Sequence, residues 1–227
     1  MPDLLVVMGA TKVRGTMNLY MRQLSDAGIE VYARDISGLD APFNLGMKIE
    51  YMRWAGSMFS HYEKLVLSDS FDVTFHVFRN SVLRKIPDDG VLWAAEKNCY
   101  PDKSIEDRIP NVGPRRFANG GLLCGTPRAI VEWANAAQSH PGYRADMLDQ
   151  EFLNERLAES SPLCRIDSRA EIFCCLYGGY EELEFNNGIP RNRDTGTSPN
   201  FLHANGNWSS HAMLGRYVAS FAQEAHP

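Results

Sequence analysis

The sequence predicts an α/β fold in which a mostly parallel central sheet is flanked by helices. The N-terminal segments follow the order strand, helix, strand, which is the order of a right-handed parallel unit. Further along the chain, short apolar runs bounded by polar residues are typical of strands buried on both faces. The 227 residues, of which 44% are hydrophobic and 22% charged, suit one globular domain. We therefore expect residues 1–227 to form a single domain.

Residues 4–33 carry this strand–helix–strand opening. Residues 4–8 form an apolar run, and residues 16–27 show helical spacing of apolar side chains that ends at Gly28. Residues 29–33 supply the next strand. No G-x-G-x-x-G pattern follows the first strand, so a dinucleotide fingerprint is absent, but the small residues there let a nucleotide approach the backbone.

A predicted helix at residues 48–60 leads into a buried strand at residues 65–67. Lys48 opens that helix, where its ammonium group either meets a phosphate or is solvated. The strand is followed by Asp69 and Asp72, at the carboxyl edge where open α/β sheets bind ligands. Two carboxylates there suit a hard divalent cation, although Asp and Ser are also common in ordinary turns.

The pattern of a strand followed by an acidic residue recurs later in the chain. Residues 91–95 form a second buried strand, and Glu96 follows it. Residues 73–85 form another element, and the glycines in residues 116–125 indicate a tight turn or a close approach to a ligand. The repetition of acidic strand ends favours a functional site over isolated turn residues.

The C-terminal half is predicted to contain two helices, two short strands, a loop and a terminal helix. The two helices begin at residues 126 and 146, and the short strands span residues 166–167 and 172–173. The loop spans residues 186–200, and the terminal helix spans residues 211–225. No repeat, low-complexity tract or linker divides the chain into domains.

The charge and the cysteine content exclude several classes of protein. The formal net charge of −5 gives no general attraction to nucleic acid or to an anionic membrane. No stretch reaches the ~20 apolar residues of a membrane span, and the N-terminus lacks a signal-peptide pattern, so no membrane partner is expected. Five cysteines without a C-x-x-C pair argue against structural zinc and a disulfide framework, and we expect reduced thiols in a cytoplasmic protein.

Taken in order, several segments resemble the glycosyltransferase domain of procollagen lysyl hydroxylases and related collagen glycosyltransferase-like proteins. The match covers residues 48–208, with weaker similarity at the first strand. It is carried by LSDSFD at 67–72, AAE at 94–96, CYP at 99–101, RFANGG at 116–121, DQ at 149–150, RID at 165–167, IF at 172–173 and HANG at 203–206.

This resemblance implies a GT-A-type fold, a UDP-sugar donor and Mn²⁺ or another divalent cation. By the resemblance, Asp69, Asp72 and His203 hold the metal, a set that suits octahedral Mn²⁺. It also implies contacts to the nucleotide and the diphosphate from Ala10, Thr11, Lys48, Ser70, Phe71, Asn205 and Gly206.

Four further residues are implied to face the reacting groups. Glu96 and Tyr100 resemble residues beside the acceptor and the transferred sugar, and the family more often has Trp where Tyr100 stands. Asn119 and Asp149 resemble residues around the donor sugar, and the family's poly-Asp run is reduced here to Asp146 and Asp149.

The predicted activity is metal-dependent transfer of a hexose from UDP-glucose or UDP-galactose to an acceptor hydroxyl. That hydroxyl belongs to a glycan, a protein, a small molecule or a modified DNA base. Asp149 or Glu96 stabilises the sugar cation or takes the acceptor proton, and both assignments stay open. The alternatives are a UDP-sugar hydrolase or nucleotidyltransferase, and a non-catalytic module that binds a nucleotide sugar.

Overall fold

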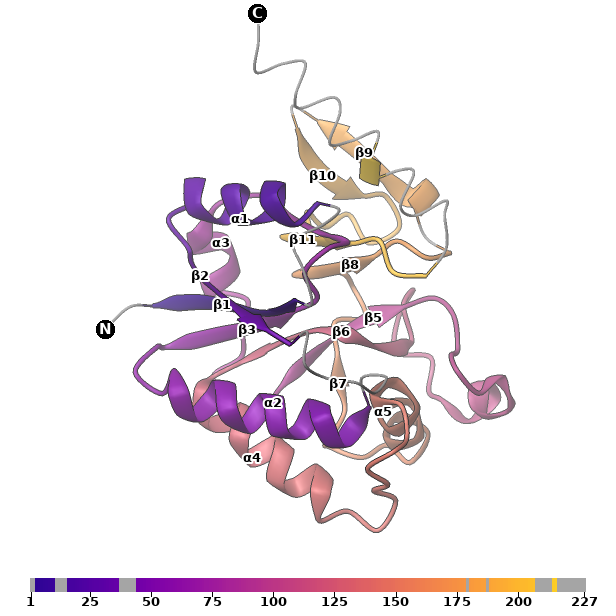
Figure 1. The fold of residues 1–227 in the computed structure, drawn as a ribbon. Coiled ribbons are helices and arrows are strands. Elements are labelled where there is room, and N and C mark those ends of the chain that lie inside the picture. Colours follow the sequence, from indigo (N-terminus) through magenta and orange to yellow (C-terminus); the bar gives the residue numbers. More distant parts are fainter. Residues whose placement is uncertain are drawn as a thin grey trace, which may run out of the picture.

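The computed structural model describes residues 3–10, 16–36, 44–178, 180–186, 188–206 and 214–215. Its centre is a six-stranded sheet in the order β2-β1-β3-β6-β5-β7 (Figure 1). The strands are β1 (Leu4–Ala10), β2 (Glu30–Asp35), β3 (Lys64–Ser68), β5 (Leu92–Glu96), β6 (Phe117–Gly125) and β7 (Arg165–Ile166). The pairings of β1 with β2, of β1 with β3 and of β5 with β7 are parallel, and both pairings of β6 are antiparallel. The predicted α/β class is therefore confirmed.

Three helices cover one face of this sheet: α2 (Leu45–Met58), α4 (Pro127–Gln138) and α5 (Asp149–Ala158). The side chains of Asn44 and Thr126 cap the N-termini of α2 and α4 by accepting backbone N–H groups. Gly56 lets these two helices approach closely, because a Cβ there would lie 2.7 Å from the carbonyl oxygen of Pro127.

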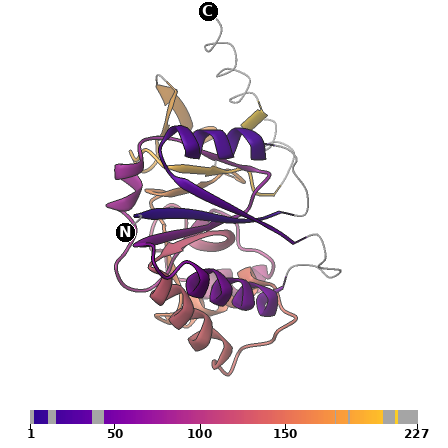
Figure 2. The same cartoon turned by 60° about the vertical axis from the view of Figure 1, so that its left-hand side comes forward.

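The opposite face is covered by α1 (Met17–Asp26) and by a small second sheet, with α3 (Arg79–Leu83) beside them (Figures 1 and 2). The second sheet has the order β4-β11-β8, from β4 (Val73–Phe75), β11 (Phe201–His203) and β8 (Phe173–Cys175). Phe75, Phe173 and Phe201 pack their rings together in its core. The described elements are completed by a hairpin, β9 (Leu183–Asn186) and β10 (Ile189–Asn192), and two 3-10 helices, η1 (Lys103–Arg108) and η2 (Tyr180–Glu182).

Most predicted elements have their counterparts in the structure, with three corrections. The glycine-containing stretch at 116–125 is not a turn but the long strand β6, because it is paired on both sides by β3 and β5. The predicted loop at 186–200 contains β10, which pairs with β9. Helix α2 begins at Leu45, so Lys48 lies inside its first turn and not at its start. The predicted terminal helix falls outside the described residues, except for Leu214 and Gly215, which are helical.

All five cysteines are free and buried. Among the residues that the structure describes, no helix combines the length and the apolar character that crossing a bilayer requires.

Candidate active site

The turn that joins β3 to β4 carries the two predicted metal-binding acids. The backbone N–H of Asp69 donates to the carbonyl oxygen of Gly121 at 2.8 Å, which ties the turn to β6. On its other side, Ser68 Oγ donates to the carbonyl of Asp69 at 2.6 Å and lies 3.0 Å from the hydroxyl of Tyr20. Asp69 is therefore held by two strands and by α1, although its side chain remains 48% exposed.

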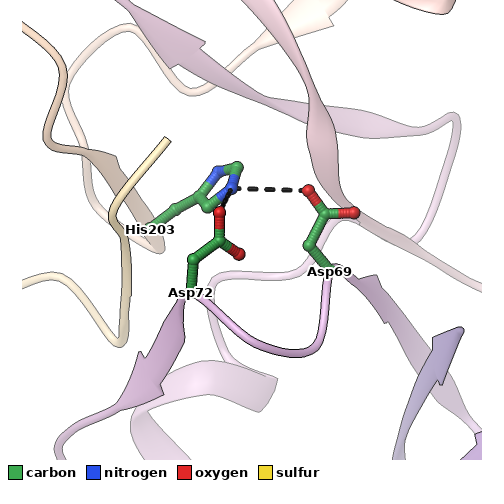
Figure 3. Close-up of side chains that lie close together, drawn as sticks. All are labelled: Asp69, Asp72 and His203. Atoms are coloured by element: carbon green, nitrogen blue, oxygen red, sulfur yellow. Dashed lines mark ion pairs between the residues drawn. The ribbon is translucent and has the colours of Figure 1, made fainter. Parts of the chain in front are cut away.

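His203 reaches these acids because β11 pairs with β4. His203 lies opposite Val73, and the N–H of Ala204 donates to the carbonyl oxygen of Asp72 at 2.8 Å. The Nε2 atom of His203 is 3.4 Å from Asp69 Oδ2 and 3.3 Å from Asp72 Oδ2 (Figure 3). Burial alone lowers the pKa of His203, but the neighbouring Asp72 and Asp69 outweigh it and raise that pKa well above its usual value.

Asp69, Asp72 and His203 fit a divalent metal ion. Each offers one ligand atom, and these atoms lie within 4.8 Å of one another. Two carboxylates and an imidazole are a donor set that Mn²⁺ and related cations accept. A Cβ at Gly121 would meet both the His203 ring and the Asp69 carboxylate, so only glycine leaves these two side chains room to converge.

A cavity of about 600 Å³ opens beside this triad. The predicted residues that line it are Lys48, Asp69, Asp72, Glu96, Tyr100, Asn119, Asp149, His203, Asn205 and Gly206. They come from the ends of β3, β5 and β11, from β6, and from the first turns of α2 and α5. The structure therefore brings together side chains that lie up to about 160 residues apart in the chain.

Strand β6 runs between two acidic groups in this cavity. A Cβ on Gly121 would meet Asp69, whereas a Cβ on the preceding Gly120 would meet the carboxylate of Asp149. Lys48 lies on the Asp149 side, where its Nζ donates to the carbonyl oxygen of Gly120 at 2.7 Å and is 3.7 Å from Asp149 Oδ2. The cavity thus holds a buried ammonium group and a carboxylate on one side of β6, and the triad on the other.

Glu96 is the centre of a hydrogen-bonded network at the floor of the cavity. It accepts from Nε2 of Gln150 and, at 2.5 Å, from Nδ2 of Asn205. Burial raises the pKa of Glu96, and the hydrogen bonds from Gln150, Asn205 and Asn119, together with the charge of His203, offset part of that effect. This carboxyl group therefore joins β5, α5 and the segment after β11.

Three predicted nucleotide contacts lie outside the set that lines the cavity. Ala10 ends β1 and accepts a hydrogen bond from the N–H of Ile36. Ser70 is buried in the β3–β4 turn, and Phe71 is 39% exposed with its carbonyl bonded to Thr16. Thr11 lies outside the described residues.

The sequence prediction omitted four lining residues: Gly120, Gly121, Gln150 and Tyr177. The two glycines and Gln150 stand within matching segments and were not assigned a role there. Tyr177 carries no sequence signal, because its position depends on how the chain leaves β8. Its backbone is held by Asn205, whose Oδ1 accepts the Tyr177 N–H at 3.2 Å, and by Asn98, which donates to its carbonyl at 3.1 Å.

Comparisons with known proteins show what the whole chain is similar to. A procollagen-lysine,2-oxoglutarate 5-dioxygenase from Drosophila melanogaster is 27% identical over 180 residues, which cover 71% of this chain and 24% of the relative. A multifunctional procollagen lysine hydroxylase and glycosyltransferase from Caenorhabditis elegans is 29% identical over 169 residues, which cover 69% of this chain and 23% of the relative. The chain thus matches about a quarter of the length of these curated relatives.

The fold is similar to that of a solved glycosyltransferase involved in the glycosylation of the major capsid of PBCV-1. The TM-score is 0.57 at 11% identity, and the match covers 94% of this chain and all of the other. At this identity the likeness establishes the fold, which is the GT-A-like α/β type. The family model described as the PLOD GT domain matches residues 1–226. The chain therefore belongs to the PLOD GT domain family.

Proposed function

We propose that this protein is a metal-dependent glycosyltransferase that moves glucose or galactose from a UDP-sugar to an acceptor hydroxyl. The observation that carries the proposal is the convergence of Asp69, Asp72 and His203 at the edge of a cavity that also holds Lys48 and Asp149. Membership of a glycosyltransferase family supports the reaction class. The donor, the metal and the acceptor are the parts that this proposal adds.

Asp69, Asp72 and His203 would hold Mn²⁺ or a similar cation. When bound, the cation neutralises the charge that builds on the diphosphate as its bond to the sugar breaks. Lys48, Asn205 and Gly206 line the same cavity and are assigned to the diphosphate. Ala10, Ser70 and Phe71, which lie at or after the ends of β1 and β3, are assigned to the uridine, and Thr11 is assigned to it from the sequence alone.

The reaction breaks the bond between the anomeric carbon and the UDP oxygen, which leaves with the electron pair. A bond from the anomeric carbon to the acceptor oxygen forms, and the acceptor proton passes to Asp149 or Glu96, carboxylates that line the cavity outside the triad. We assign Asp149 to the donor sugar, next to Lys48, whose Nζ lies 3.7 Å from Asp149 Oδ2. Glu96 already accepts hydrogen bonds from two side-chain amide groups. We therefore assign Glu96, with Tyr100, to the acceptor side of the cavity.

Asn119 has a local role that supports the donor side. Its Oδ1 accepts the N–H of Gly121 at 2.9 Å and so fixes the backbone of β6 where Gly120 and Gly121 line the cavity. The register of β6 against β5 shifts between Trp93 and Ala94, close to this point. The irregularity leaves Gly120 and Gly121 without partners in β5, and both line the cavity where we place the transferred sugar.

The direct test is a UDP-release assay with a panel of UDP-sugars, with and without Mn²⁺. Release of UDP from UDP-glucose or UDP-galactose that depends on Mn²⁺ supports the proposal. An acceptor panel then separates transfer from hydrolysis, because a hydrolase yields free sugar at the same rate without any acceptor. Binding of UDP with no turnover of any sugar in the presence of acceptors identifies the protein as a binding module and contradicts the proposal.

A further inference from the structure

The two ring nitrogens of His203 have different surroundings. Nε2 faces the carboxylates of Asp69 and Asp72 and is the atom available to a metal ion. Nδ1 lies 3.9 Å from the sulfur of Cys175, which is within reach of an N–H···S hydrogen bond. A neutral imidazole that binds a metal through Nε2 carries its proton on Nδ1, so this proton needs an acceptor in the buried interior.

Strand register produces this contact. In the second sheet β11 runs parallel to β8, and His203 lies directly opposite Cys175. Opposite residues on neighbouring strands point to the same face, so the strand register places the sulfur beside the ring. Arg115 fixes the end of β8, because its Nη1 donates to the carbonyl oxygen of Cys175 at 2.5 Å and its side chain is fully buried.

The adjacent Cys174 provides an internal comparison. It is as fully buried as Cys175 but points to the other face of the sheet, where it packs with Leu202 and Leu176. Its sulfur contacts Nδ2 of Asn192 at 3.9 Å and no metal-binding residue. The two neighbouring thiols thus share strand and burial and differ in whether they touch His203.

We propose that Cys175 is a positioning residue for the metal site: its sulfur accepts the Nδ1–H of His203 and keeps Nε2 directed at the space between Asp69 and Asp72. This inference rests on the proposed function, since it requires that His203 binds the metal. A histidine ligand normally donates its second N–H to an oxygen acceptor, which fixes the tautomer and the ring orientation. Here a thiol occupies that place.

Two simpler roles for Cys175 make different predictions. A cysteine that only fills space in the core is replaceable by valine, which is apolar and of similar size. A cysteine that ligates the metal directly would place sulfur on the ion. The contact through Nδ1, on the opposite side of the ring from the carboxylates, favours positioning over ligation.

The experiment compares metal binding by the wild type, Cys175→Ser, Cys175→Val, Cys175→Ala and the control Cys174→Val. Mn²⁺ affinity is measured by titration calorimetry, and Co²⁺ serves as a spectroscopic probe of coordination geometry. We expect Kd for Mn²⁺ to rise about tenfold in Cys175→Val and Cys175→Ala, because loss of such a partner typically weakens metal binding by that order. Cys175→Ser retains an acceptor and stays within about threefold of the wild type, and Cys174→Val matches the wild type.

The Co²⁺ spectra separate the remaining roles. In the positioning role the visible bands change in Cys175→Val and not in Cys174→Val, and no variant shows a sulfur-to-cobalt charge-transfer band. A charge-transfer band that disappears in Cys175→Ser makes the thiol a ligand and overturns the proposal. Equal Mn²⁺ affinity in Cys175→Val and Cys174→Val reduces Cys175 to a core residue and overturns it as well.

The thermal midpoint of each metal-free variant shows whether it folds. If both Cys175→Val and Cys175→Ala are unfolded, the Cys175→Ser protein carries the test. A folded Cys175→Ser whose Kd for Mn²⁺ rises tenfold or more would contradict positioning, because serine keeps the acceptor. If the wild type binds no divalent cation, the proposed metal site itself is contradicted. If the wild type binds Mn²⁺ and the affinity is the same in every Cys175 variant, only this inference is contradicted.

Discussion

The ammonium nitrogen of Lys48 lies 2.7 Å from the carbonyl oxygen of Gly120, which joins the first turn of α2 to β6 inside the cavity. The side chain is 7% exposed, and the carboxylate of Asp149 is 3.7 Å away. A buried cation held by a backbone oxygen is a fixed charge. The positive charge of Lys48 compensates the negative charge of Asp149 in the free protein. In the proposed complex, Lys48 also faces the UDP-sugar.

Replacing Lys48 with methionine keeps the length of the side chain and removes its charge. We expect KM for the UDP-sugar to rise about tenfold or more, because a hydrogen bond to a charged group contributes roughly 1.5–3 kcal/mol. Steady-state UDP release measures this KM. The control is Lys85→Met, which removes the charge of another partly buried lysine, just after α3. An unchanged KM in Lys48→Met contradicts the diphosphate role.

Removing one acid of the triad tests the metal site. In Asp69→Ala we expect transfer to fall below detection while the metal-free protein keeps its fold, because the side chain is half exposed and supports no core packing. Circular dichroism checks the fold and calorimetry checks Mn²⁺ binding. An active Asp69→Ala protein that still requires the metal would exclude Asp69 as a ligand.

Adding a single methyl group at Gly121 spreads the triad apart. In Gly121→Ala the new Cβ meets the His203 ring and the Asp69 carboxylate, which must move away from each other. We expect Mn²⁺ affinity to fall at least tenfold, together with a loss of thermal stability, because the buried His203 ring must shift. Gly9→Ala, whose new Cβ meets only the flexible Ile36 side chain, is the matched control for a glycine in the central sheet. Equal Mn²⁺ affinity in the two variants would contradict the packing argument.

His76 makes the fold sensitive to acid. It is buried, its Nε2 lies 2.8 Å from Thr74 Oγ1, and burial lowers its pKa from 6.5 to about 3. Below pH 6.5 the unfolded chain takes up a proton that the folded chain does not, so stability falls as the pH drops from 6.5 towards 3. The free energy of unfolding is expected to fall by about 1.4 kcal/mol for each pH unit in this range.

Denaturant unfolding of the wild type and His76→Gln across this range measures the effect. The wild type should lose its stability advantage over His76→Gln as the pH falls, and the exposed His61→Gln serves as the control substitution. Parallel curves for the wild type and His76→Gln would show that His76 is protonated without a cost in the folded state.

The strands that could be predicted from the sequence are those whose own residues determine their burial. The apolar runs in β1 and β3 are buried along nearly their whole length, and local pattern is enough to identify them. The strand β6 escaped prediction because Gly120 and Gly121 have low strand preference on their own. Its extended shape is imposed by β3 and β5 on either side, which no local pattern records.

The candidate site was predictable to a similar extent. The spacing of Asp69 and Asp72 after a strand suits either a metal site or an ordinary turn, and the family resemblance favours the metal site. His203 was assigned only through family resemblance, because its proximity depends on the pairing of β11 with β4. The contacts of Lys48, Gln150 and Tyr177 depend on the tertiary arrangement of whole elements. The cytoplasmic location, the sugar and the acceptor stay predictions.

The pairing of β11 between β4 and β8 also has a consequence for the order in which the protein becomes functional. Two acids of the triad are synthesised about 130 residues before the histidine that completes it. A growing chain therefore has only a weak, solvent-exposed pair of carboxylates until its last described strand inserts. Any metal-binding energy would be available only to the chain with that strand in place, so a bound ion would stabilise the paired second sheet.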